Sequence, residues 1–175
     1  RSLFKGHPCV LAGSVGRLDG RARPGDTVEV VSDSGEFMAR ASYSPDSQIR
    51  ARVWSFDTNE TIDHGFFKRR VASAVARRRA IPELTTQQGL RLIHAESDGL
   101  PGVIADLYDD TLVIQLTSAG AEKWRGALVD ALKIATNCAR IYERSDSDVR
   151  GLEGLEPVVG WLVGEPPTTP IVIRE

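Results

Sequence analysis

Apolar and polar positions alternate in short runs over the first 56 residues. A strand, a turn and a strand are predicted over 23–44, where valines alternate with polar residues and 32–35 forms a glycine-containing hairpin turn. A further strand is predicted over 49–56. Its two faces carry Ile49, Ala51 and Val53 on one side and Arg50, Arg52 and Trp54 on the other. Short strands between Gly and Pro turns predict a small β-barrel or sandwich.

A helical period replaces this alternation after residue 62. Asp63 is the predicted N-cap, and the helix is expected to run to about Ala80, because Ile81 precedes a proline and resists helical geometry. Its buried stripe is predicted to be Phe67, Val71, Ala74 and Val75. The rest of its surface carries Lys68, Arg69, Arg70, Arg77, Arg78 and Arg79. The arginines at 77–79 are interpreted as a solvated face or as contacts between modules.

The second half of the chain mixes strands with one amphipathic helix. Strands are predicted over 102–108 and 111–118, a helix over 119–136 and a third strand over 139–146. A short strand follows at 158–164. The chain is therefore predicted to be α+β, with a small β-barrel followed by an α+β unit of order β-β-α-β.

Charge is distributed unevenly between the two halves. Residues 1–80 hold 14 Lys and Arg against 9 Asp and Glu, whereas residues 81–175 hold 8 against 15. A basic first half and an acidic second half suggest two modules with different partners. No run approaches the roughly 20 apolar residues of a membrane helix, so no membrane partner is expected. The isolated Cys9 and Cys138 indicate buried thiols in a reducing cytoplasm.

The stretch "ESDGLPGV" (96–103) raises the question of a catalytic cluster, because Ser97 and two acids follow His94. A triad needs the base within hydrogen-bond reach of the hydroxyl, but the strand would carry His94 away from the turn. Ser97 also lacks the GxSxG elbow that exposes a nucleophile. Asp98 is expected to bond backbone amides ahead of it, and the glycines allow left-handed geometry. The stretch is therefore predicted to be a turn, and no catalytic residue is assigned.

Metal and nucleotide sites find no support in the sequence. The three histidines are isolated, and no GxGxxG or GxxxxGK[ST] pattern is present. The run at 144–148 lacks the remaining ligands of a calcium loop and is interpreted as a solvated loop.

The basic residues of the first unit, together with nearby aromatic side chains, suit RNA, where backbone charge and base stacking both contribute. The candidate RNA-binding residues are Lys5, Arg17, Arg21, Arg23, Tyr43, Arg50 and Arg52. The alternative is that Arg50 and Arg52 only coat the solvent face of an edge strand while Trp54 packs inside.

Several motifs resemble one family. The run from Gly6 to Trp54, above all "YSPDSQIRARVWSFD" (43–57), resembles the N-terminal PUA domain of the RlmI-type 23S rRNA cytosine methyltransferases. "LIHAESDGLPGVIADLYDDTLVIQLTSAGAE", followed by "IYERSDSDVR" and "EGL", resembles the middle domain of the same family. The resemblance runs in the same order along nearly the whole chain.

The resemblance implies a particular division of the chain. It suggests a PUA-like RNA-binding β-barrel at 1–62, a linking helix at 63–82, a middle α+β domain at 83–168, and at 169–175 the start of a truncated C-terminal methyltransferase domain. That missing domain would bind S-adenosylmethionine and carry the catalytic cysteine, which neither Cys9 nor Cys138 matches. The chain departs from the family at Cys9, where Trp is frequent, and at 150–155, which is less basic.

Three functions follow as hypotheses. The leading one is the rRNA-recognition part of a 5-methylcytosine methyltransferase, inactive alone and without cofactor, whose full-length form would use S-adenosylmethionine. The second is a stand-alone, non-catalytic PUA-type RNA-binding adaptor. The third is a protein-interaction module whose acidic second half docks a basic partner. The sequence leaves a homodimer open.

Overall fold

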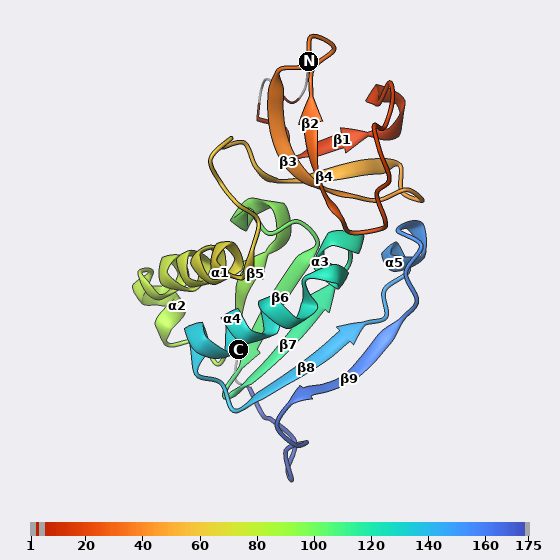
Figure 1. Cartoon of the computed structure of the whole chain (residues 1–175). Helices are drawn as coiled ribbons and strands as arrows, with labels where there is room; N and C mark the ends of the chain where they lie inside the picture. Colours follow the sequence, from red (N-terminus) through yellow and green to blue (C-terminus); the bar gives the residue numbers. More distant parts are fainter. Residues whose placement is uncertain (1–2, 4–5, 174–175) are drawn as a thin grey trace.

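Two β-sheets organise the structure, and a long helix packs against the second of them (Figure 1). The structure is a computed structural model that describes residue 3 and residues 6–173. The first sheet is antiparallel and has the order β1-β4-β3-β2. Its strands are β1 (Cys9–Leu11), β2 (Thr27–Val31), β3 (Phe37–Tyr43) and β4 (Ile49–Ser55). The strands predicted over 23–44 and 49–56 are confirmed.

Small side chains fill the core of the first sheet. Ala39, Ala41, Ala51 and Val53 are fully or almost fully buried, and Val10 joins them from β1. The register places Ala41 opposite Val53 and Tyr43 opposite Ala51, so the alanines lie together on one face. A core of alanines and valines removes little apolar area from water, and the hydrophobic stabilisation scales with that area. The first sheet therefore depends on contacts with the rest of the chain.

The second sheet has five strands in the order β5-β6-β7-β8-β9. They are β5 (Gly89–His94), β6 (Val103–Tyr108), β7 (Thr111–Leu116), β8 (Arg140–Ser145) and β9 (Val158–Val163). All neighbours are antiparallel except β7 and β8, which are parallel and are therefore joined by a helical crossover. The predicted β-β-α-β order is present, and β5 and β9 extend it at both edges.

Helices lie against the second sheet and at its upper end in Figure 1. They are α1 (His64–Arg79), α2 (Pro82–Thr85), α3 (Ala119–Lys123), α4 (Arg125–Thr136) and α5 (Val149–Leu152). In α1 the Asp63 side chain accepts a hydrogen bond from the Phe66 amide at 2.8 Å, which confirms the predicted N-cap. The predicted stripe of α1 is buried in the same core as α4 and the sheet, together with Phe66. No helix within the described residues is long and apolar enough to span a bilayer.

The single helix predicted over 119–136 is interrupted at Trp124. This residue has φ −95° and ψ 15°, which ends α3 and begins α4 in a new direction. The break has a packing reason, because α3 contacts β3 of the first sheet whereas α4 lies along α1. Trp124 fills the corner, with its ring 4.9 Å from that of Phe67. One straight helix would not make both contacts.

The stretch at 96–103 is a turn, as predicted. Residues 95–98 form a short 3-10 helix, and Gly99 follows in the left-handed region at φ 68°. Gly102 is also left-handed at φ 76°, and a side chain there would meet Ser118. Both Ser97 and the His94 ring are exposed to solvent. No hydrogen bond joins these two side chains in the described part of the chain, so the catalytic cluster is not formed.

The role expected for Asp98 needs a correction. Its carboxylate bonds the amide of His94, behind it in the chain, at 2.7 Å. It also accepts hydrogen bonds from Arg78 at 2.6 and 2.7 Å and from Arg77 at 2.8 Å. Burial alone would raise the pKa of Asp98, but the bonds from Arg78, Arg77 and the His94 amide hold it below its ordinary value. Asp98 thus fastens the turn to the end of α1.

We expect Asp98→Asn to lower the free energy of unfolding by about 2–4 kcal/mol, because it leaves two arginines without their shared carboxylate. Urea unfolding followed by circular dichroism measures this change. Asp130→Asn is the matched control, since Asp130 is exposed on α4 and makes no ion pair within the described residues. Equal effects of the two substitutions would contradict a structural role for Asp98.

Candidate nucleic-acid interface

The predicted RNA residues fall into two groups in the structure, and Lys5 lies outside the described residues. The first group, Arg17, Arg21 and Arg23, is exposed on the segment that leads from β1 to β2. Arg17 is 83% exposed and pairs with Asp19 at 3.2 Å. Arg21 makes no ion pair with any described residue, and the Arg23 amide donates to Asp26 at 2.8 Å. This segment therefore presents free positive charge to solvent.

The second group lies on the strands and is less accessible. Tyr43 is half-buried at the end of β3, and Arg50 donates a hydrogen bond to the carbonyl of Pro45. Arg52 is only 12% exposed and forms ion pairs with Glu96 at 3.1 Å and Glu153 at 3.0 Å. Its charge is therefore compensated by two carboxylates of the second half of the chain. Contact of Tyr43, Arg50 or Arg52 with RNA stays a prediction.

Glu153 is the centre of the junction between the two sheets, a role that no motif or periodicity in the sequence indicates. Its side chain is 1% exposed, and one oxygen accepts hydrogen bonds from the Ser44 hydroxyl at 2.8 Å and the Ala119 amide at 3.3 Å. The other oxygen accepts from Arg52. Burial alone would raise the pKa of Glu153, but bonds from Ser47, Ser44 and Arg52 and the charge of Arg52 hold it below its ordinary value. The carboxylate is therefore ionised at neutral pH.

Trp54 adds an apolar link across the same junction. It lies on β4 of the first sheet, is 2% exposed, and belongs to the core of the second sheet. Its ring centroid is 5.2 Å from that of Phe67 and 6.3 Å from that of Phe66, in edge-to-face geometry. Of the alternative considered from the sequence, the part in which Trp54 packs inside is confirmed. The part in which Arg50 and Arg52 only coat the solvent face of an edge strand is wrong, because β4 lies between β1 and β3 and Arg52 is only 12% exposed.

Glycines allow the two halves to approach closely. A Cβ on Gly120 of α3 would lie 2.4 Å from the Ser42 Cβ and 2.8 Å from the Trp54 ring. A Cβ on Gly25 would lie 2.4 Å from the Ala119 carbonyl oxygen. Atoms of larger side chains cannot occupy these positions, so α3 and the first sheet are in direct contact.

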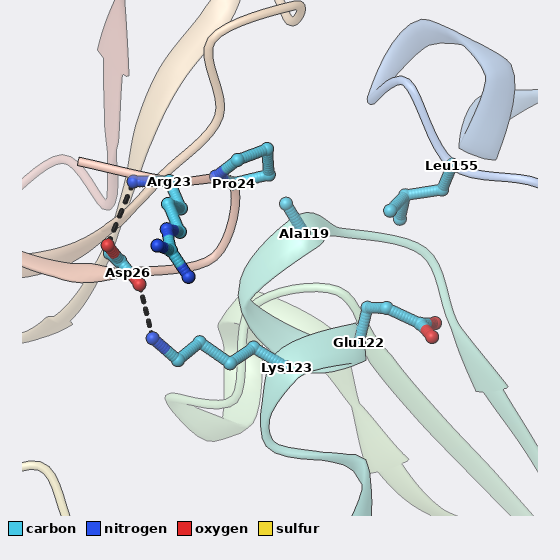
Figure 2. A pocket seen from close by; sticks show the side chains of 7 residues that line it. All are labelled: Arg23, Pro24, Asp26, Ala119, Glu122, Lys123 and Leu155. Atoms are coloured by element: carbon cyan, nitrogen blue, oxygen red, sulfur yellow. Dashed lines mark hydrogen bonds and ion pairs between the residues drawn. The ribbon is translucent and has the colours of Figure 1, made fainter.

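A shallow cleft opens where the Arg23 segment meets α3 (Figure 2). It has a volume of about 430 Å³, and Arg23, Pro24 and Asp26 line it from one side. From the other side it is lined by Ala119, Glu122, Lys123 and Leu155. The Lys123 ammonium pairs with Asp26 across the cleft, and this contact lowers the pKa of Asp26. The cleft therefore places two cationic side chains, Arg23 and Lys123, at the junction beside the carboxylates of Asp26 and Glu122.

Two further charged groups of the second half, Arg150 and Glu143, are occupied by structural contacts. Arg150 is 2% exposed and donates to the carbonyls of Leu116 and Glu156 and to the Glu122 carboxylate. The buried Glu143 pairs with Arg125 at 3.0 Å. Arg150 therefore has no free charge for phosphate, in line with the weak basic signal of 150–155.

Among the described residues, neither a metal-binding cluster nor an activated cysteine is formed. They contain no group of three or more His, Cys, Asp or Glu side chains that could hold a metal ion. Both cysteines are free thiols, and burial raises the pKa of the Cys9 thiol, which disfavours the nucleophilic thiolate.

Comparisons with known proteins find relatives along the chain. Residues 1–56 match the PUA-like domain family. Over all of its 175 residues the chain is 50% identical to ribosomal RNA large subunit methyltransferase I of Alteromonas mediterranea, and it covers 44% of that protein. It is 48% identical to the protein of the same name from Shewanella frigidimarina, again over 100% of this chain and 44% of the relative. The chain is therefore a homologue of these proteins over the whole of its own length.

Two solved structures share the fold. One is a proposed SAM-dependent methyltransferase from Streptococcus mutans, with a TM-score of 0.76 and 18% identity over 94% of this chain and 41% of that one. The other is a proposed methyltransferase in complex with SAH, with a TM-score of 0.81 and 18% identity over 99% of this chain and 43% of that one. The α+β fold with an N-terminal PUA-like domain is thereby confirmed. The chain spans less than half the length of the relatives that it matches.

We expect Glu153→Gln to lower the free energy of unfolding by about 2–4 kcal/mol at pH 7, because the amide cannot replace a buried, multiply bonded carboxylate. The folded-state pKa is depressed, so this stabilisation is present above the unfolded pKa of about 4.3 and is lost as the pH falls through the lower folded value. Urea unfolding at pH 7 and below pH 4 measures both effects. The control is Glu156→Gln, whose side chain is exposed. If the difference in unfolding free energy between the two variants is as large in acid as at pH 7, the role assigned to the Glu153 carboxylate is wrong.

Gly120→Ala is expected to destabilise the chain by about 1–3 kcal/mol, because the added methyl overlaps Ser42 and the Trp54 ring. Gly126→Ala is the matched control, since a Cβ there meets nothing within 4 Å and favours the helix by up to about 1 kcal/mol. Differential scanning calorimetry of the two variants gives opposite shifts in Tm if α3 touches the first sheet as described.

Proposed function

We propose that this chain is the RNA-recognition part of a SAM-dependent 23S rRNA methyltransferase that forms 5-methylcytosine. The observation that carries the proposal is the 48–50% identity to ribosomal RNA large subunit methyltransferase I over the full length of the chain. The PUA-like match at 1–56 and the exposed Arg17, Arg21 and Arg23 support an RNA partner. In this proposal the partner is rRNA and the compartment is the cytoplasm.

Methyl transfer would then depend on residues that this chain does not contain. The relatives are more than twice as long, and we propose that SAM binding and the catalytic cysteine belong to their remaining length. The 175 residues alone are accordingly expected to bind rRNA with or without SAM and to transfer no methyl group.

The first domain and its exposed arginines would act by holding the RNA backbone. Phosphate contacts position a nucleic acid and carry no sequence information, so they suit a module that presents rRNA to a separate catalytic domain. The junction centred on Glu153 and Trp54 would fix the direction in which the RNA leaves the first domain.

A stand-alone RNA-binding adaptor is the second candidate, favoured by the absence of a catalytic constellation in the described residues. The two candidates differ in what the gene encodes after Glu175. Reading the codons beyond that residue separates them: an open frame that encodes a SAM-binding domain supports the methyltransferase, and a stop codon supports the adaptor.

RNA binding is tested by titrating a fluorescent 23S rRNA fragment with the chain at several KCl concentrations. We expect the affinity to fall steeply with salt, and Arg21→Gln with Arg23→Gln to weaken binding and to reduce the slope of log K against log salt by about 1–2, roughly one for each lost phosphate contact. Arg144→Gln is the control, because Arg144 is 66% exposed on β8, far along the chain from these residues. Absent or salt-insensitive binding would instead favour a protein partner.

A further inference from the structure

Helix α1 carries more positive charge than its structural contacts use. It contains one lysine and five arginines and no Asp or Glu. Two carboxylates outside the helix compensate part of this charge. Glu60 pairs with Arg69 at 2.6 Å and lies 3.9 Å from Arg70, and Asp98 binds Arg77 and Arg78. The six basic side chains of α1 are thus compensated by only two carboxylates.

The cations that remain are on the solvent side of the helix. Lys68 and Arg79 are exposed and make no ion pair or hydrogen bond with any described residue. Arg69 and Arg77 keep 64% and 51% of their side chains exposed despite their ion pairs. Arginines in a last helical turn also stabilise the helix dipole, which accounts for part of the cluster at 77–79. That effect does not extend to Lys68, which lies in the second turn.

One face of α1 combines these cations with small side chains. His64, Lys68, Ala72, Ala76 and Arg79 follow one another at spacings of four, four, four and three residues, and all five are exposed. Lys68 and Arg79 are separated by about 16 Å along the helix axis, at 1.5 Å per residue. Because the side chains between them are only methyl groups, nothing protrudes from this face between the two cations. An extended chain of phosphates can therefore approach both Lys68 and Arg79.

This face continues the cleft at the junction of the sheets. A second cavity of about 230 Å³ is lined by His64, Lys123, Trp124, Gly126 and Ala127. Lys123 also lines the first cleft, beside Arg23. The centroid of the His64 ring lies 5.8 Å from that of Trp124, which also lines this cavity. Arg23, Lys123, His64 and Lys68 therefore follow one another from the first domain onto α1.

We infer that these residues form a second RNA contact, a phosphate track that leads from Arg23 through Lys123 and His64 to Lys68 and Arg79. The inference rests on the proposed function, because it assigns the path of the same rRNA beyond the first domain. Flexible cations around small side chains fit a flexible polyanion, and the track includes no exposed large apolar side chain that would anchor a protein partner. Such contacts position the RNA and do not read its sequence.

The test compares the chain with the double variant Lys68→Gln, Arg79→Gln in the same rRNA titration. We expect binding about three- to tenfold weaker at 0.1 M KCl and a salt slope reduced by about 1–2. Both side chains are exposed and unpaired, so only the small helix-dipole contribution of Arg79 is lost and Tm should change little. A loss of folding therefore cannot explain the result. Lys68→Glu should weaken binding more than Lys68→Gln. Arg144→Gln serves as the control, because Arg144 alternates with the helix-facing Glu143 and Ser145 and therefore lies on the other face of the sheet.

The outcomes separate the inference from the proposed function. If the unmodified chain binds rRNA and the Arg21 and Arg23 variant weakens it, but the α1 variant does not, the track is refuted and the proposed function stands. If the unmodified chain binds no rRNA at 0.1 M KCl, the proposed function fails and the track fails with it. If polyglutamate of equal charge displaces the RNA, and this displacement depends on the same α1 residues, the surface binds an acidic protein. The RNA track is then overturned.

Discussion

The buried carboxylate of Glu153 is the contact on which the arrangement of the two sheets depends. It receives Arg52 and Ser44 from the first sheet and the Ala119 amide from the start of α3, so three segments distant in the chain meet at one side chain. An unpaired charge at this depth would cost several kcal/mol, so the halves must dock for the charge to be tolerated. Trp54 adds the apolar part of the same contact. The first sheet, whose own core is built mainly from alanines, is stabilised in this way by the second.

Because many charges are paired inside the structure, the net charge of each half does not describe the charge of its surface. Several carboxylates that make the second half acidic are buried, among them Asp98, Glu143 and Glu153, and each is bound by arginine. The surface of the second half is therefore less acidic than its composition suggests. Lys68 and Arg79 stay free on α1, and Arg21 stays free in the first domain. The inferred phosphate track connects the free charge on α1 to the junction.

This charge distribution relates the fold to the proposed function. The PUA-like domain would make the first contact with rRNA. The second half of the chain, docked against it, would add further contacts in a fixed direction. A rigid junction matters for such a protein, since the target base must reach a catalytic domain that lies elsewhere. Under the proposed function, the described residues would orient and bind the rRNA, while the reaction would belong to the additional length of the relatives.

The sequence by itself determined the local elements and the family. The alternation over 23–56, the Asp63 cap, the stripe of α1 and the turn at 96–103 were all predictable, because they depend on neighbours in the chain. The motifs in the sequence also showed the resemblance to the methyltransferases. Tertiary structure decided the rest: that Trp124 breaks a helix, that Asp98 binds arginines twenty residues away, and that Arg52 is used at the junction. These depend on contacts between distant segments, and periodicity carries no information about which distant side chain will compensate a charge.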